Sequence, residues 1–125
     1  MNFVNLMAYD DHASANHSSL QYAGDSINYW QQRGLPPEKT VLGVPFYSHP
    51  NFVSYKKLVE ADPAAAQVDE FEYSGALANY NGLPTMRQKT ALAQHRASGI
   101  MIWTLENDTV DEYSLLKAIY ETAHK

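Results

Sequence analysis

Three apolar segments of this sequence end in side chains that could bind or act on a ligand. They are residues 3–9, 40–47 and 99–105. The first ends in Tyr9 with Asp10 after it, the second ends in Tyr47, and the third carries Trp103 with Glu106 after it. A phenol can donate a hydrogen bond, a carboxylate can stabilise a developing positive charge, and an indole offers a flat apolar face to a sugar ring. The alternative is that the aromatic residues pack in a core and that Asp10 only begins a loop.

Residues 3–9 divide into two different faces if they form a strand, because side chains alternate along a strand. One face is wholly aliphatic and consists of Val4, Leu6 and Ala8. The other is mixed and consists of Phe3, Asn5, Met7 and Tyr9. The aliphatic face suits packing against helices, and the mixed face suits the interior of a barrel that opens toward a site at its C-terminal end.

The elements that would position these residues alternate between strand and helix. Helical patterns occupy residues 25–34, with Asp25 or Ser26 as the N-cap and Gly34 as the stop, and residues 85–98, with Thr85 and Gln88 at capping-box spacing. A last helix is expected over about residues 111–123. Strands that alternate with helices predict parallel βαβ units. Residues 48–83 interrupt this order as an excursion, in which residues 54–61 form a short helix and Phe71 to Ser74 a short strand.

Composition limits the fold and the partners. The chain has 125 residues, 45% of them hydrophobic, which suffices for one domain. Its net charge of −5 and the lack of a Lys/Arg cluster argue against nucleic acid or a membrane surface as a partner. Cysteine is absent, so no disulfide framework is expected. Three parallel strands leave unpaired edges, and a complete (β/α)8 barrel needs about 250 residues. We therefore expect part of a larger domain, or a chain that completes itself by association.

Metal and cofactor sites are not expected. Asp10, Asp11 and His12 are adjacent, and three consecutive residues cannot all converge on one ion from a strand end. The other histidines have no metal-ligand spacing; they are His17, His49, His95 and His124. No glycine-rich phosphate-binding pattern occurs, so no cofactor is predicted.

Taken together, the three segments resemble a known family. The motifs LMAYD, LGVPFYS and GIMIWTLEND, with the helical stretches YNGLPTMRQKTALA and SLLKAI, are similar to the sixth to eighth strands and last helices of family 18 glycoside hydrolases, the chitinases and their relatives. The resemblance implies a partial (β/α)8 TIM barrel: residues 1–125 would be the C-terminal part of the catalytic barrel, and residues 48–83 the excursion between its second and third strands here.

The resemblance also implies a chemistry. Members of the family cleave β-1,4 bonds next to N-acetylglucosamine with retention, and the substrate's own acetamido oxygen is the nucleophile. Tyr9 would then hydrogen-bond the acetamido carbonyl, and Asp10 would place negative charge near the developing cation. Met7 would line the pocket, Trp103 would form its floor, and Tyr47 and Glu106 would contact the sugar. The expected partner is an N-acetylglucosamine oligosaccharide such as chitin.

Two departures from the family's pattern qualify this expectation. In the family, the catalytic acid is the Glu of a DxxDxDxE motif on the fourth strand. That motif does not occur in this sequence, and the acidic residues 69–72, DEFE, have the wrong spacing. The chain alone is therefore predicted to be inactive. In addition, Ser48 and His49 stand where many relatives have Gly-Arg.

Several alternatives stay open. The parent barrel is an enzyme if it has the catalytic Glu, or a lectin-like glycan-binding barrel if it does not. The substrate could be peptidoglycan or an N-glycan core in place of chitin. The chain could also be an independent small α/β protein without a sugar site. The family resemblance favours a secreted or extracytoplasmic protein.

Overall fold

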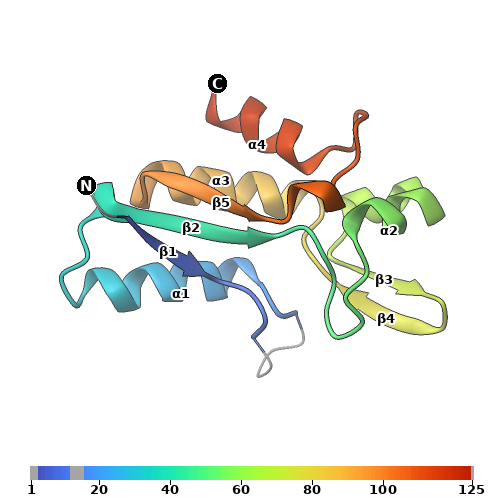
Figure 1. Cartoon of the computed structure of the whole chain (residues 1–125), viewed down its shortest axis with the longest axis horizontal. Helices are drawn as coiled ribbons and strands as arrows, with labels where there is room; N and C mark the ends of the chain where they lie inside the picture. Colours follow the sequence, from blue (N-terminus) through green and yellow to red (C-terminus); the bar gives the residue numbers. More distant parts are fainter. Residues whose placement is uncertain (1–2, 12–15, 125) are drawn as a thin grey trace.

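A parallel sheet of three strands forms the centre of the structure, a computed structural model that describes residues 3–11 and 16–124. The strands are β1 (Val4–Met7), β2 (Thr40–Pro45) and β5 (Gly99–Trp103), in the order β1-β2-β5 (Figure 1). Their register aligns Met7 with Gly43 and Gly43 with Met101. The three predicted strands are thus confirmed, although each is shorter than its apolar segment. The residues that follow each strand, including Tyr9 and Tyr47, belong to loops at the same edge of the sheet.

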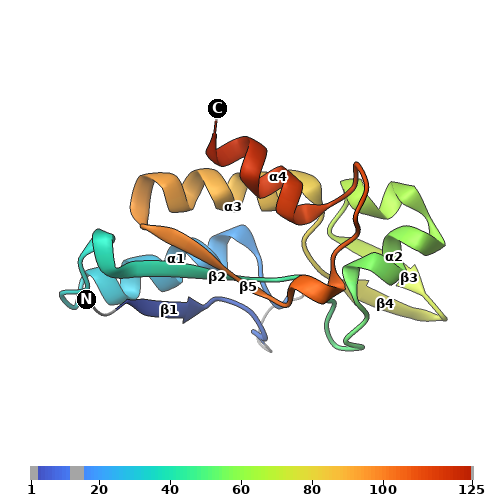
Figure 2. The ribbon, with the colours of Figure 1, turned by 45° about the horizontal axis from the view of Figure 1, so that its top comes forward.

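Helices cover one face of this sheet. They are α1 (Leu20–Gln31), α3 (Leu83–Arg96) and α4 (Leu115–Ala123). Both α1 and α3 contact β2, α3 also contacts β5, and α4 packs on α3 (Figure 2). None of the helices in the described part of the chain is long and apolar enough to cross a membrane.

The two faces of β1 differ as the alternation predicts. Leu6 and Ala8 are buried in the core, whereas Met7 is 67% exposed. Val4, also expected on the buried face, is 44% exposed at the start of the strand. On the neighbouring strand, Leu42 is fully buried. The mixed face of the sheet therefore has no covering layer within the described residues, as expected for part of a barrel. The same holds for the outer edges of β1 and β5, which pair with no other described strand.

The excursion forms a small lobe beyond the C-terminal end of β2 (Figure 1). It contains α2 (Tyr55–Ala61), a 3-10 turn (Pro63–Gln67) and an antiparallel hairpin of β3 (Glu70–Tyr73) and β4 (Ala76–Asn79). The predicted short helix and short strand are both present. The hairpin turn lies at Ser74 and Gly75, both with positive φ. The loop after β2 joins the lobe, because His49 exchanges backbone hydrogen bonds with Asn79.

The predicted N-caps of two helices are wrong. Helix α1 begins five residues before Asp25, because the Ser19 side chain accepts a hydrogen bond from the Tyr22 backbone N–H and caps it there. Gly34 does adopt a positive φ, of 102°, beyond the end of this helix. Helix α3 begins after Gly82, so Thr85 lies inside its first turn and donates its hydroxyl to Asp69 Oδ2.

The last helix begins at Leu115, four residues later than predicted. Ser114 caps it by accepting a hydrogen bond from the Lys117 backbone N–H. The carboxylate of Asp108 accepts further bonds from the backbone N–H groups of Leu115 and Leu116 and from the Ser114 hydroxyl. Asp108 therefore belongs to the helix start, where a carboxylate is stabilised by free N–H groups.

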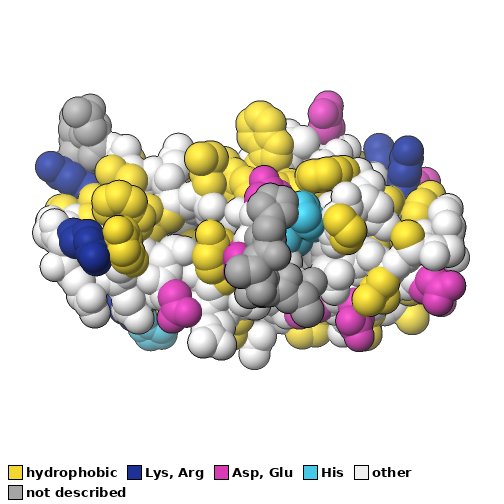
Figure 3. Space-filling model, turned by 90° about the horizontal axis from the view of Figure 1, so that it is seen from below, with side chains coloured by type: hydrophobic (Ala, Val, Ile, Leu, Met, Phe, Trp, Pro, Cys, Tyr) yellow, Lys and Arg dark blue, Asp and Glu magenta, His cyan; other side chains and the backbone are white. Residues whose placement is uncertain are grey.

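One group of exposed aromatic side chains lies away from the strand ends. Tyr29 and Trp30, near the end of α1, are 49% and 46% exposed and pack edge to face. Hydrophobic side chains gather on the surface at this end of the molecule in Figure 3. Arg33 lies over the Tyr29 ring, with its guanidinium carbon 3.7 Å from the ring centroid. The other tryptophan, Trp103, is at the opposite end of the sheet.

Candidate functional site

Asp10 lies where the chain turns away from β1. Its φ is +63°, a left-handed conformation that Asp adopts more readily than most residues. Its backbone N–H donates to Nδ1 of the buried His17 at 2.9 Å, and the backbone N–H of Asp11 donates to the His17 carbonyl at the same distance. His17 thus holds the backbone on both sides of the Asp10 side chain, which is left free to face the loop after β2.

Tyr47 binds the Asp10 carboxylate directly. Its hydroxyl donates to Asp10 Oδ1 at 2.5 Å. Burial and then this bond to the Asp10 carboxylate raise the pKa of Tyr47 far above its usual range. The phenol therefore keeps its proton near neutral pH and acts as a donor. Tyr47 is only 8% exposed, and its hydroxyl gives the Asp10 carboxylate one orientation.

Tyr9 lies beside this pair because of a glycine. Its ring packs edge to face on Tyr47, with centroids 6.1 Å apart. A Cβ on Gly43 would come within 3.1 Å of the Tyr9 ring and 2.8 Å of the Leu6 carbonyl oxygen. Only glycine leaves this space in the middle of β2. Burial, followed by the nearby charge of Asp10, raises the pKa of Tyr9, so its phenol is also a donor at neutral pH.

Further rings extend the site toward the excursion. His17 stacks on His49 at 5.2 Å and also contacts Tyr47, while Phe52 stacks on Tyr47 at 5.9 Å. Burial and the neighbouring His49 lower the pKa of His17 to about 4, with Asp10 opposing the shift, so the His17 imidazole is neutral. The result is a continuous aromatic wall behind the Asp10 carboxylate.

A cavity of about 310 Å³ opens in front of this wall. Its lining consists of Asp10, Tyr47, Phe52, Trp103 and Asn107. Trp103 is 57% exposed at the end of β5, so much of its indole face is available to a ligand. The cavity thus combines a carboxylate, a phenol and an exposed indole that come from the ends of all three strands.

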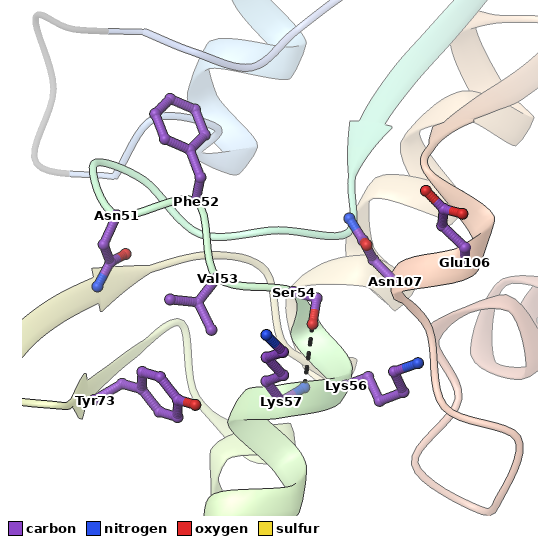
Figure 4. Close-up of a pocket in the computed structure, with 9 residues that line it drawn as sticks. All are labelled: Asn51, Phe52, Val53, Ser54, Lys56, Lys57, Tyr73, Glu106 and Asn107. Atoms are coloured by element: carbon purple, nitrogen blue, oxygen red, sulfur yellow. Dashed lines mark hydrogen bonds between the residues drawn. The ribbon is translucent and has the colours of Figure 1, made fainter.

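A second cavity of about 610 Å³ continues from the first, sharing Phe52 and Asn107 with it. It lies between the loop after β2, the start of α2 and the turn after β5 (Figure 4). Two lysines at the start of α2 and Tyr73 of the hairpin line it, and Figure 4 shows the Tyr73 ring on the side of the hairpin. Lying side by side, the two cavities have linings that extend from Trp103 to the excursion.

The predicted site residues are only partly brought together. Asp10, Tyr47 and Trp103 share the first cavity, and Tyr9 packs against Tyr47. Glu106 lines the second cavity instead. Met7 lines neither of the two and stands 67% exposed on the uncovered face of the sheet.

Sequence reasoning missed three residues here. They are His17, Phe52 and Asn107. His17 is separated from Asp10 by a loop, and no spacing rule links the two. Phe52 lies in the loop after β2, and Asn107 ends a 3-10 turn after β5 (Leu105–Asn107), so only the fold brings them to the cavity. The pattern of aromatic residues following each strand is the signal that could have pointed to Phe52.

Within residues 3–11 and 16–124, no group of three or more His, Asp or Glu side chains could hold a metal ion. His12, considered with Asp10 and Asp11 as a metal ligand, lies outside the described residues.

Comparison with known proteins identifies the family. The model of the glycosyl hydrolases family 18 matches residues 1–108. The chain belongs to this family. Its structure superimposes on the family 18 chitinase ChiB of Flavobacterium johnsoniae with a TM-score of 0.87 and 33% sequence identity, over 98% of this chain and 42% of that one. The human chitinase-3-like protein 2 is 27% identical over 105 residues, which represent 64% of this chain and 26% of the relative.

The fold is also similar to that of a chitinase with lower sequence identity. A mutant plant class V chitinase from Cycas revoluta, solved in complex with (GlcNAc)3, has a TM-score of 0.77 and 22% identity, over 98% of this chain and 46% of that one. This chain thus spans less than half the length of these solved relatives. Its three parallel strands and their helices are part of a family 18 TIM barrel, as the sequence motifs predict.

Proposed function

We propose that this chain forms the sugar-positioning part of a chitinase-like site for N-acetylglucosamine oligosaccharides. The observation that carries this proposal is the shared cavity of Asp10, Tyr47 and Trp103 at the C-terminal ends of three parallel strands, where barrel enzymes place their sites. The complex of the Cycas chitinase with (GlcNAc)3 supports a ligand of this class. The second cavity offers room for further sugar units.

The side chains fit a division of roles. The indole of Trp103 would take the apolar face of one sugar ring. The Tyr9 phenol, protonated at neutral pH, would donate to the acetamido carbonyl and hold its oxygen near the anomeric carbon. The Asp10 carboxylate would stabilise the positive charge that develops during cleavage. The Tyr47 phenol would orient that carboxylate, and its ring, which lines the same cavity, would contact the sugar.

Hydrolysis by the complete protein would be retaining and substrate-assisted, at β-1,4 bonds. The chain contains no DxxDxDxE motif. We propose that the proton for the leaving oxygen comes from a Glu elsewhere in the complete barrel, and that residues 1–125 are its C-terminal part with residues 48–83 as the excursion. If the complete barrel lacks such a Glu, the second candidate is a barrel that binds glycans without cleaving them.

The test is a titration of the complete protein that carries this chain with chitooligosaccharides. Residues 1–125 contain two tryptophans, Trp30 and Trp103. In a Trp30→Phe background, Trp103 is the only source of tryptophan fluorescence from this part of the molecule. A fluorescence change together with cleavage products of retained anomeric configuration supports the enzyme. A fluorescence change without cleavage products supports the glycan-binding barrel. Parallel titrations with peptidoglycan fragments and an N-glycan core test the other substrates. No response to any of these glycans would contradict the proposal.

A further inference from the structure

Lys89 is a charged residue in an unusual place. It lies on the inner face of α3 and is completely buried. Its Nζ donates to the backbone oxygen of Ser18 at 2.7 Å and to Ser18 Oγ at 2.5 Å. An ammonium group loses its hydration when it is buried, and burial lowers the pKa of Lys89 to about 7, with Asp69 acting in the opposite direction. A methionine or leucine would fill the same space without this cost, so packing alone does not explain a lysine here.

Ser18 connects Lys89 to the backbone next to the site. Its hydroxyl accepts from Lys89 and donates its own hydrogen to the carbonyl oxygen of Ala8, the residue before Tyr9. The Ser18 backbone oxygen also accepts from the side-chain amide of Asn81 at 2.9 Å. Two buried side chains, one on α3 and one just before it, therefore converge on a single serine.

The same short segment holds the backbone around Asp10. His17 accepts from the backbone N–H groups of Asp10 and Asp11, while Ser18 donates to Ala8. Backbone groups of Ala8, Asp10 and Asp11 thus all bind His17 or Ser18, and Lys89 Nζ donates two hydrogen bonds to Ser18. The Tyr9 phenol and the Asp10 carboxylate therefore project from a backbone segment that Ser18 links by hydrogen bonds to Lys89 of α3.

We propose that Lys89 is a positioning residue, which acts through Ser18 to fix the Tyr9–Asp10 segment in the geometry that the site requires. The inference rests on the proposed function for its effect on sugar chemistry, although its effect on the geometry of the segment does not depend on any ligand. Two bonds from one buried Nζ fix both the hydroxyl and the backbone oxygen of Ser18, which suits a residue that must hold a loop.

The test compares Lys89→Met, which keeps the length of the side chain and removes its donors, with Lys39→Met as the matched control. Lys39 is exposed at the start of β2, at the opposite end of the strand from the site. Both variants are made in the complete protein. For Lys89→Met we expect kcat on chitooligosaccharides to fall between about tenfold and about a hundredfold with a smaller change in KM, the result of a misplaced reacting group. Lys39→Met should match the wild type.

A ligand-free measurement separates positioning from simple loss of stability. The ¹⁵N signals of the His17 imidazole report the bond that its Nδ1 accepts from Asp10. We expect them to shift in Lys89→Met and to stay unchanged in Lys39→Met, at temperatures where both proteins are folded. If neither the His17 signals nor kcat changes in Lys89→Met, the inference is overturned.

Two further outcomes are also decisive. If the wild type neither binds nor cleaves the oligosaccharide, the proposed function fails, and the His17 signals alone decide the positioning role. If Lys89→Met does not fold, Ser18→Ala replaces it, since it removes only the hydroxyl that joins Lys89 to Ala8. Ser18→Ala should shift the His17 signals in the same way, and unchanged signals would overturn the inference.

Discussion

The Tyr47 hydroxyl donates a hydrogen bond to Oδ1 of Asp10 at 2.5 Å, joining the loops that follow β1 and β2. The two residues are 37 positions apart in sequence, and the parallel pairing of β1 with β2 brings them together. This bond gives the carboxylate one orientation at the lining of the first cavity.

Replacing Tyr47 with Phe should disorient the Asp10 carboxylate. A matched control is Tyr55→Phe, because Tyr55 is also buried and its hydroxyl donates to the Tyr113 backbone oxygen, away from the site. Each variant loses one bond, so the free energy of unfolding should fall by about 1–3 kcal/mol in both. Only Tyr47→Phe should also weaken oligosaccharide binding in a calorimetric titration. Equal binding by the two variants would remove Tyr47 from the site.

Replacing Tyr9 with Phe tests the donor to the acetamido group. The ring and its packing on Tyr47 remain, and only the hydroxyl is lost. If the complete protein is an enzyme, we expect kcat to fall about a hundredfold with a modest change in KM, because the positioning of the attacking oxygen is lost. Steady-state kinetics on chitooligosaccharides measure both constants. An unchanged kcat would contradict the role given to Tyr9.

Replacing Trp103 with Ala should mainly weaken sugar binding. Loss of an apolar platform of this size corresponds to about 1.5 kcal/mol, or roughly a tenfold rise in Kd. Trp30→Ala is the control, since that indole is similarly exposed at the other end of the sheet. Calorimetric titration with chitooligosaccharides should distinguish the two. The assignment of Trp103 fails if both variants bind as the wild type does.

Replacing Gly43 with Ala should displace Tyr9. The added Cβ would lie 2.8 Å from the Leu6 backbone oxygen and 3.1 Å from the Tyr9 ring, so either the strand or the ring must move. We expect a loss of about 1–3 kcal/mol in stability and weaker activity or binding. Gly24→Ala is the opposite case: nothing lies within 4 Å of its new Cβ, and alanine in a helix should add up to about 1 kcal/mol. Chemical denaturation of both variants gives the comparison.

Acid should destabilise the fold through His17. Its pKa is lowered to about 4 in the folded protein, against an ordinary value of 6.5. Between these values the unfolded chain binds a proton that the folded chain does not, so the stability present above pH 6.5 is lost as the pH falls toward 4. The slope is at most about 1.4 kcal/mol per pH unit.

The measurement is the free energy of unfolding as a function of pH, compared between the wild type and His17→Gln. The variant should lack this component of the slope. His95→Gln, at an exposed position on α3, should retain it. If the wild type and His17→Gln have parallel curves between pH 6.5 and 4, the buried neutral state of His17 is contradicted.

Much of the framework could be predicted from local sequence. The apolar runs predicted all three strands, and the alternation along residues 3–9 predicted the burial of Leu6 and Ala8 but not the exposure of Val4 at the start of β1. Such patterns are local because burial of a strand face depends on every second residue. Helix starts were less predictable: Ser19, Asp25 and Ser26 are all good caps, and the structure uses Ser19, which accepts from the Tyr22 backbone N–H.

The sequence by itself determined the family, the parallel βαβ order and the presence of aromatic and acidic residues after the strands. Only the tertiary structure decided that Tyr47 donates to Asp10, that His17 accepts from the Asp10 backbone N–H, and that Lys89 is buried against Ser18. These contacts join residues 7 to 71 positions apart. No periodicity in a chain encodes such pairs, because they arise where strand register and helix packing bring separate loops to the same edge of a sheet.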